Sequence, residues 1–106
     1  MEKIALIIEE IKNEQKKVIV EKTSSIVNEI MFLLTNIKSS NNVEEANKYF
    51  DTLQNIQNIL AVTFFKDELY LGDALWKFVK DFDRADDMRT RTYLFNKIKK
   101  DEYALS

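Results

Sequence analysis

The sequence predicts an all-α protein, a small antiparallel bundle of three or four helices in a single domain spanning residues 1–106. The chain has no proline and only one glycine, so the usual breakers of long helices are nearly absent. Apolar residues recur at steps of three and four, and nowhere do they alternate long enough to form a strand. With 45% hydrophobic residues, 106 positions are enough for one core.

The first helical stretch covers residues 3–38, where we expect either one long helix or a helix kinked at the polar segment KNEQKK, residues 12–17. Its apolar positions keep the amphipathic period. They are Ile4, Ile8, Ile11, Ile19, Ile26, Ile30, Leu33 and Ile37.

Residues 39–42, SSNN, predict the first loop, and Asn42 followed by Glu45 resembles a capping box. A second helix is expected from Val43 to about Lys66. Its last part, ILAVTFF at residues 59–65, is apolar on nearly every face and should lie centrally in the core.

Gly72 marks the next interruption, with Asp73 as a plausible N-cap of the following helix. The apolar stripe continues through Leu75, Phe78, Val79, Phe82 and Ala85, and a last segment carries Leu94, Phe95 and Ile98. Residues 73–100 therefore form one helix, or two helices with a break near residues 85–88.

Composition excludes most catalytic chemistry. The chain has no cysteine and no histidine, which removes disulfides, thiolate sites, the commonest general base and the usual zinc ligand. No serine lies in a recognisable nucleophile motif, and no glycine-rich phosphate loop occurs. We therefore expect a non-enzymatic protein with no catalytic residues, no metal and no cofactor.

The segment DFDRADDMRTR, residues 81–91, holds all three arginines of the protein, Arg84, Arg89 and Arg91. Its carboxylates do not fit a calcium-binding loop, although two of them on one helical face could contact Mg²⁺. The spacing instead predicts a ladder of Asp–Arg pairs along a helix: 81 with 84, 86 with 89, and 87 with 91. The alternative is that these guanidinium groups bind an acidic partner.

Charge is unevenly spread at this end of the chain. Residues 67–87 hold seven acids and three bases, whereas residues 88–106 hold five bases and two acids. Acids near the start and bases near the end of a last helix would complement its dipole. The other interpretation is a bipolar binding face.

Two aromatic residues are candidate contacts. Trp76 lies about 100° from Leu75 on a helix, toward Lys80, and Tyr70 lies beside the Gly72 interruption. Both residue types are enriched at binding hot spots, whereas the phenylalanines are expected in the core.

Two apolar clusters on the first helical stretch, VIV at 18–20 and IMFLL at 30–34, are difficult to bury in so small a bundle. Either this helix is the central one or a second copy of the chain covers it, which makes a homodimer an alternative to test.

The remaining partner classes are constrained by charge and length. A net charge of −2 and a pI near 5.2 make nucleic acid an unfavoured partner, and the most basic stretch is NKIKK at 96–100. The start of the chain has only five consecutive apolar residues and the longest uncharged run is half polar, so we expect no membrane segment and a cytoplasmic location.

These exclusions leave an adaptor, inhibitor or regulator that binds another protein through Tyr70, Trp76, Arg84, Arg89 and Arg91. Lysine outnumbers arginine 13 to 3, which suggests a bacterial, phage or plasmid origin. A nucleic-acid-binding regulator and an immunity-type or structural protein of a mobile element are the alternatives.

Overall fold

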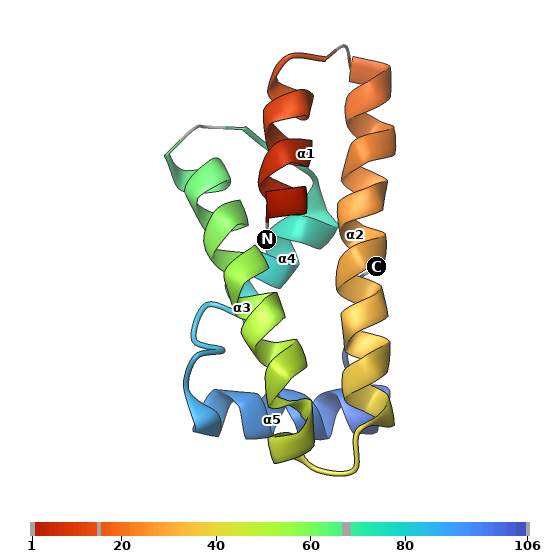
Figure 1. Ribbon diagram of the computed structural model, residues 1–106, viewed down its shortest axis with the longest axis vertical. Coiled ribbons are helices and arrows are strands. Elements are labelled where there is room, and N and C mark those ends of the chain that lie inside the picture. Colours follow the sequence, from red (N-terminus) through yellow and green to blue (C-terminus); the bar gives the residue numbers. More distant parts are fainter. Residues whose placement is uncertain (1, 15, 67–68, 106) are drawn as a thin grey trace.

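The computed structural model describes residues 2–14, 16–66 and 69–105, and this part of the chain folds into five helices with no strand (Figure 1). The helices are α1 (Glu2–Lys12), α2 (Lys16–Ser39), α3 (Val43–Phe65), α4 (Asp73–Asp81) and α5 (Met88–Lys99). The predicted all-α class is confirmed, but the expected number of three or four helices is wrong.

The prediction of one long helix over residues 3–38 is also wrong, because the polar segment holds a chain reversal instead of a kink. The chain turns at Asn13 and Glu14, and α1 and α2 lie antiparallel (Figure 1). Lys3 pairs with Glu29 at 3.6 Å, and Lys22 pairs with both Glu10 and Glu14. The reversal allows Ile4, Ile8 and Ile11, which are at most 3% exposed, to join the common core.

Helix α3 is the central element, because it packs against each of the other four helices. It begins where the sequence predicts, with the Asn42 side chain accepting a hydrogen bond from the Glu45 backbone N–H at 2.8 Å. The expected burial of its last part is only partly right. Leu60 and Thr63 are buried, but Val62 and Phe65 are exposed because the neighbouring helices cover that side only in part.

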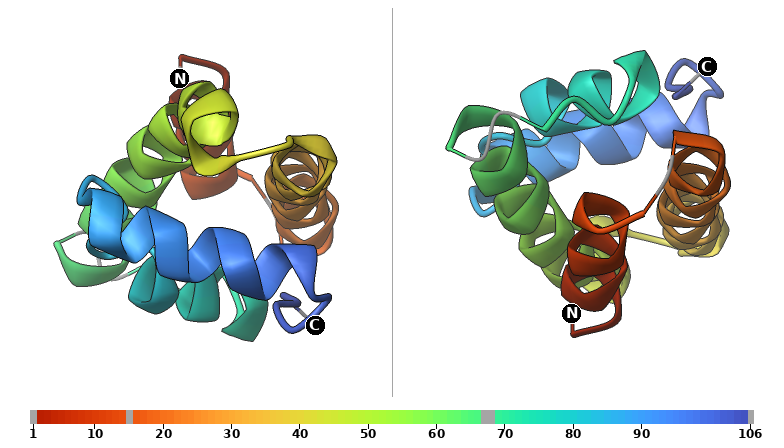
Figure 2. Two further views of the ribbon diagram at one scale, coloured as in Figure 1. Left: turned by 90° about the horizontal axis from the view of Figure 1, so that it is seen from below. Right: turned by 90° about the horizontal axis from the view of Figure 1, so that it is seen from above.

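Helices α4 and α5 run across the bundle, so the architecture is not a simple antiparallel one (Figure 2). The N-cap of α4 is Gly72, one residue earlier than expected, with a φ of 109° that favours glycine. The chain leaves the helical conformation over residues 82–87, which decides between one helix and two in favour of a break.

Long-range polar contacts hold the two crossing helices in place. The buried Gln57 side chain on α3 donates to the Val79 carbonyl of α4 at 3.1 Å. At the other end, Lys99 of α5 donates to the Lys38 and Ser40 carbonyls at 2.7 and 2.9 Å, satisfying groups left free where α2 ends. Among the described residues, no helix is long and apolar enough to cross a membrane.

Candidate functional site: an exposed aromatic cluster and a pinned loop

Four aromatic side chains form a cluster at one edge of the bundle. Phe64 and Phe65 come from the end of α3, Tyr70 from the connection to α4, and Trp76 from α4 itself. The centre of the Trp76 ring lies 5.5 Å from the centre of the Phe64 ring and 5.1 Å from that of Phe65, and both pairs pack edge to face. The ring centres of Phe64 and Tyr70 are 6.0 Å apart. We call these four residues the aromatic cluster.

The cluster is unusually open for residues of this kind. Phe65 and Tyr70 are each 62% exposed, and Phe64 and Trp76 are half-buried. The rings enclose a shallow hollow of about 280 Å³ together with Leu69. Because edge-to-face packing holds the rings together, the cluster offers a firm apolar surface to a partner.

The connection of residues 69–72 extends this surface toward α2. An apolar groove of about 470 Å³ lies between Ile19 and Val20 of α2 and the segment from Leu69 to Gly72. Tyr70 is held at its rim by a hydrogen bond from its hydroxyl to the Asp73 carboxylate, which also raises the pKa of the Tyr70 hydroxyl. Groove and cluster share Leu69 and Tyr70, so they form one continuous surface.

On the other side, the surface continues toward the loop of residues 82–87. A hollow of about 380 Å³ is lined by Phe65, Val79, Lys80 and Asp83. The aromatic rings are thus bordered by charged side chains near the loop, an arrangement of apolar centre and polar rim that is typical of protein interfaces.

The predicted ladder of Asp–Arg pairs does not form within the described chain. Asp81 pairs with Lys77 at 2.5 Å, and Asp87 caps α5 by accepting a hydrogen bond from the Arg89 backbone N–H at 3.2 Å. The ladder fails because the helix that would carry it is broken over residues 82–87, so the predicted pairs do not share one continuous helix.

The three arginines have different environments. Arg91 is buried, and its guanidinium donates to the Ala85 carbonyl, to Asn47 Oδ1 at 3.1 Å and to Asp51 Oδ1 at 2.8 Å. Arg91 therefore connects the loop of residues 82–87 and the start of α5 to α3 through hydrogen bonds. Arg84 and Arg89 are exposed and have no ion pair among the described residues.

The structure thus brings Tyr70 and Trp76 together, and it places Arg84 on the neighbouring loop and Arg89 at the start of α5. Phe65 was expected in the core, but its side chain is as exposed as that of Tyr70, and these two are the most exposed residues of the cluster. Its position gives a signal, because it lies five residues after Leu60 and so about 140° away from the buried face of α3.

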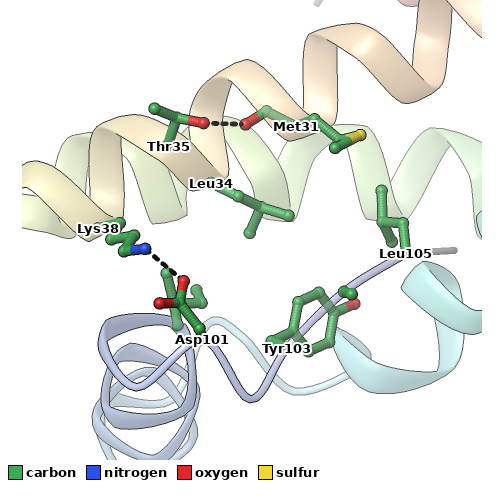
Figure 3. A pocket seen from close by; sticks show the side chains of 9 residues that line it. Met31, Leu34, Thr35, Lys38, Asp101, Tyr103 and Leu105 are labelled. Carbon is green, nitrogen blue, oxygen red and sulfur yellow. Dashed lines mark hydrogen bonds and ion pairs between the residues drawn. The ribbon is translucent and has the colours of Figure 1, made fainter.

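Another hollow, of about 260 Å³, lies between α2 and the C-terminal segment of residues 101–105 (Figure 3). Lys38 of α2 pairs with Asp101, whose φ of 58° turns the chain back toward the bundle. Tyr103 then packs edge to face on Phe82, and Leu105 is buried against the core. Burial, aided by the nearby Asp81 carboxylate, raises the pKa of the Tyr103 hydroxyl.

The carboxylates of residues 81–87 do not gather into a cluster of three or more. Within the described ranges, no three acidic side chains converge closely enough to hold an ion. What the region offers is an apolar, aromatic surface with charged borders, which is suited to binding a protein.

Comparison with known protein families gives one match. The model of the family described as "Immunity protein CdiI-like" matches residues 1–100, a range that includes all five helices. No curated protein and no solved structure gives a significant match.

Proposed function

Because the chain belongs to the CdiI-like immunity protein family, we propose that it binds a toxin protein and thereby blocks that toxin's activity. This role requires binding only, in keeping with a chain that contains neither histidine nor cysteine. The proposed place of action is the cytoplasm, as expected from the sequence.

The observation that carries the proposal for the binding surface is the exposure of the aromatic cluster. Two of its rings are 62% exposed. A partner that covers them would remove their apolar surface from water, which stabilises the complex by about 25 cal/mol for each Å² buried. We place Tyr70, Trp76 and Phe65 at the centre of the contact. Hot spots of this kind are typically aromatic and surrounded by a polar rim.

Arg84, on the neighbouring loop, is proposed as a rim contact, and Arg89, at the start of α5, as a partner contact outside the aromatic cluster. Both guanidinium groups are exposed and have no ion pair within the described chain. Arg91 contributes differently. It contacts Ala85, Asn47 and Asp51, so its proposed role is to hold the loop that presents Arg84.

A pull-down from the source cells, with mass-spectrometric identification, names the candidate toxin. The toxin should arrest growth when expressed alone, and co-expression of this chain should restore growth. Trp76→Ala and Phe65→Ala should each weaken the purified complex by about 30-fold, the effect of losing a hot spot of about 2 kcal/mol.

The matched control is Phe32→Ala, because Phe32 is also 62% exposed but lies on α2, outside the cluster. It should leave the affinity unchanged. A captured protein that does not arrest growth, or whose toxicity this chain does not relieve, would contradict the proposed function. Equal losses for Phe32→Ala and Trp76→Ala would contradict the proposed surface.

Self-association is a separate proposal that concerns α2. Met31 and Phe32 are 50% and 62% exposed, and a second copy of the chain, one of the two alternatives left by the sequence, would cover this helix. Sedimentation velocity of the purified chain tests it: a monomer at a protein concentration of about 100 µM would exclude a stable homodimer.

A further inference from the structure

Helix α5 and its C-cap residue, Lys100, are strongly basic in an otherwise acidic chain. Residues 88–100 carry five bases and no acid, whereas the rest of the sequence carries 18 acids and eleven bases. The helix lies across one end of the bundle, where one of its sides faces solvent (Figure 2). Its charge therefore forms a local patch.

The fold itself accounts for two of the five bases. Arg91 is buried and bonded to Ala85, Asn47 and Asp51. Lys99 donates to the backbone carbonyls of Lys38 and Ser40 at the C-terminal end of α2. Replacing either would disturb the packing of α5 on its neighbours.

The other three bases have no such role. Arg89, Lys97 and Lys100 have no ion pair within the part of the chain that the structure describes. Together with Tyr93, which is 60% exposed, they lie within an arc of about 80° on the helix and span about 16 Å along its axis. The Lys97 ammonium lies 5.3 Å from the centre of the Tyr93 ring. We call these four residues the α5 stripe.

The helix dipole explains part of the stripe but not all of it. Lys97 and Lys100 lie at the C-terminal end of α5, where cations are favoured. Arg89 is the second residue after the N-cap Asp87, in a first turn that has no acid, and a cation there opposes the dipole. A charge that weakens its own helix and bonds to nothing in the fold points to a role outside the fold.

We propose that the α5 stripe is a second contact surface, which binds a short acidic segment of a protein partner. The cations match two or three carboxylates spread over about 16 Å, and the Tyr93 ring offers an apolar anchor between them. The inference rests on the proposed function in one respect, namely that this partner is the toxin.

The surroundings of the stripe favour a short protein segment over nucleic acid. Exposed acids border it at both ends, Asp86 and Asp87 before it and Asp101 and Glu102 after it. A continuous phosphate backbone would run into these carboxylates, and the net charge of −2 repels a polyanion at longer range. A segment that ends within the stripe avoids both penalties.

The stripe can be tested without the toxin. The ¹⁵N-labelled full chain is titrated at low salt with a ten-residue peptide of alternating glutamate and alanine, and separately with a 20-base-pair DNA duplex. The peptide should shift amide signals within residues 88–100, and the shifts should vanish in about 0.5 M salt, where screening is strong. Tighter binding of the duplex at the stripe, or no peptide shifts, would overturn the proposal.

Two variants with the same loss of charge separate a specific stripe from general attraction. The triple change Arg89→Gln, Lys97→Gln and Lys100→Gln should abolish the shifts. The control triple Lys3→Gln, Lys48→Gln and Lys66→Gln removes three exposed lysines from other helices or their ends and should keep them. If both triple variants lose the peptide-induced shifts equally, the binding depends only on net charge and the stripe is refuted.

Once the toxin is in hand, the same variants distinguish this inference from the proposed function. The stripe triple should weaken the toxin complex about tenfold at 50 mM salt and flatten its salt dependence. If the triple binds the toxin like the wild type, the acidic-segment inference fails while the immunity function stands. If no toxin is bound at all but the peptide maps to the stripe, the proposed function fails and the chemistry of the surface stands.

Discussion

The Arg91 guanidinium of α5 lies 2.8 Å from the Asp51 carboxylate of α3, and so joins two residues that are 40 positions apart in the sequence. The same guanidinium donates to the Ala85 carbonyl in the loop of residues 82–87. One side chain thus fixes the loop, the start of α5 and the middle of α3 relative to one another.

Replacing Arg91 by lysine should therefore destabilise the fold. An ammonium group cannot reproduce the fork that reaches Ala85, Asn47 and Asp51 together, and the lost bonds involve a charged, buried donor. We expect a loss of about 1–3 kcal/mol in the free energy of unfolding, measured by urea denaturation. Asp51→Asn should cost less than about 1 kcal/mol, because the Asp51 side chain is 68% exposed. A lysine variant as stable as the wild type would contradict this role.

The Arg91 contact also shows where the sequence misleads. Local spacing pairs Arg91 with Asp87, but Asp87 caps α5 and Arg91 reaches a residue on another helix. Because that pairing depends on how α5 crosses α3, no local pattern contains it. The all-α class and most of the helical residues were predictable from the apolar period, and so was the Asn42 cap, although the division of residues 3–38 into two helices was not.

The reversal after α1 and the exposure of Phe65 were not predicted, for a related reason. Residues 12–17 contain no glycine or proline, so nothing in them distinguishes a turn from a polar stretch of helix. Whether Phe65 is covered depends on which sides of α3 are occupied by α1 and α4, which is a matter of tertiary packing. Tyr70 and Trp76 could be proposed from the sequence as candidate contacts because their types and their place beside Gly72 are local features, and their role stays a prediction.

Asn42 should contribute measurably to stability as the N-cap of the central helix. Asn42→Ala removes the acceptor of the Glu45 N–H, and caps of this kind are worth about 1 kcal/mol. Asn42→Asp should retain most of the stability, because its carboxylate accepts the same bond and complements the dipole. The neighbouring change Asn41→Ala, at an exposed position outside the cap, is the control in the same denaturation experiment. Similar losses for both alanine variants would show that the cap is not the cause.

Tyr103 should make the fold sensitive to alkali. Burial raises its pKa above the ordinary value of about 10, so the unfolded chain releases this proton at a lower pH than the folded chain. The stabilising contribution is therefore complete below about pH 10 and is lost as the pH rises above it. Tyr103→Phe should show a smaller loss over that range in denaturation curves measured at several pH values. Identical pH profiles of the two proteins would contradict this.

The same substitution should have little effect at neutral pH. The Tyr103 hydroxyl is buried and makes no hydrogen bond of good geometry within the described chain, although the Asp81 carboxylate is close enough to raise its pKa. Removing the hydroxyl therefore takes away a poorly satisfied group and keeps the ring on Phe82. We expect the unfolding free energy of Tyr103→Phe at pH 7 to equal or exceed that of the wild type. A clear loss would mean that the hydroxyl has a partner in solution.

Trp76 provides a direct optical test of the aromatic surface, because it is the only tryptophan in the chain. It is half-buried beside Phe64 and Phe65, so a partner that covers the cluster should remove the remaining water from the indole. Emission should then shift to shorter wavelength, and quenching by acrylamide should fall on complex formation. The control variant Phe32→Ala should show the same shift in emission as the wild type when it binds the toxin. If emission stays unchanged in a confirmed complex with a toxin fragment that lacks tryptophan, contact at Trp76 is excluded.

Arg89 allows the strongest separation of stability from binding. Its cation opposes the dipole at the start of α5, so Arg89→Glu should raise the free energy of unfolding by about 0.3–1 kcal/mol at low salt, and by less as salt screens the charge. Arg89→Gln should give a smaller gain, since it only removes the unfavourable charge. Both are measured by thermal and urea unfolding of the free protein. If Arg89 served the fold, either change would lower stability instead. A protein that becomes more stable and yet binds its acidic partner less tightly would show that this arginine is retained at a cost to the helix that carries it.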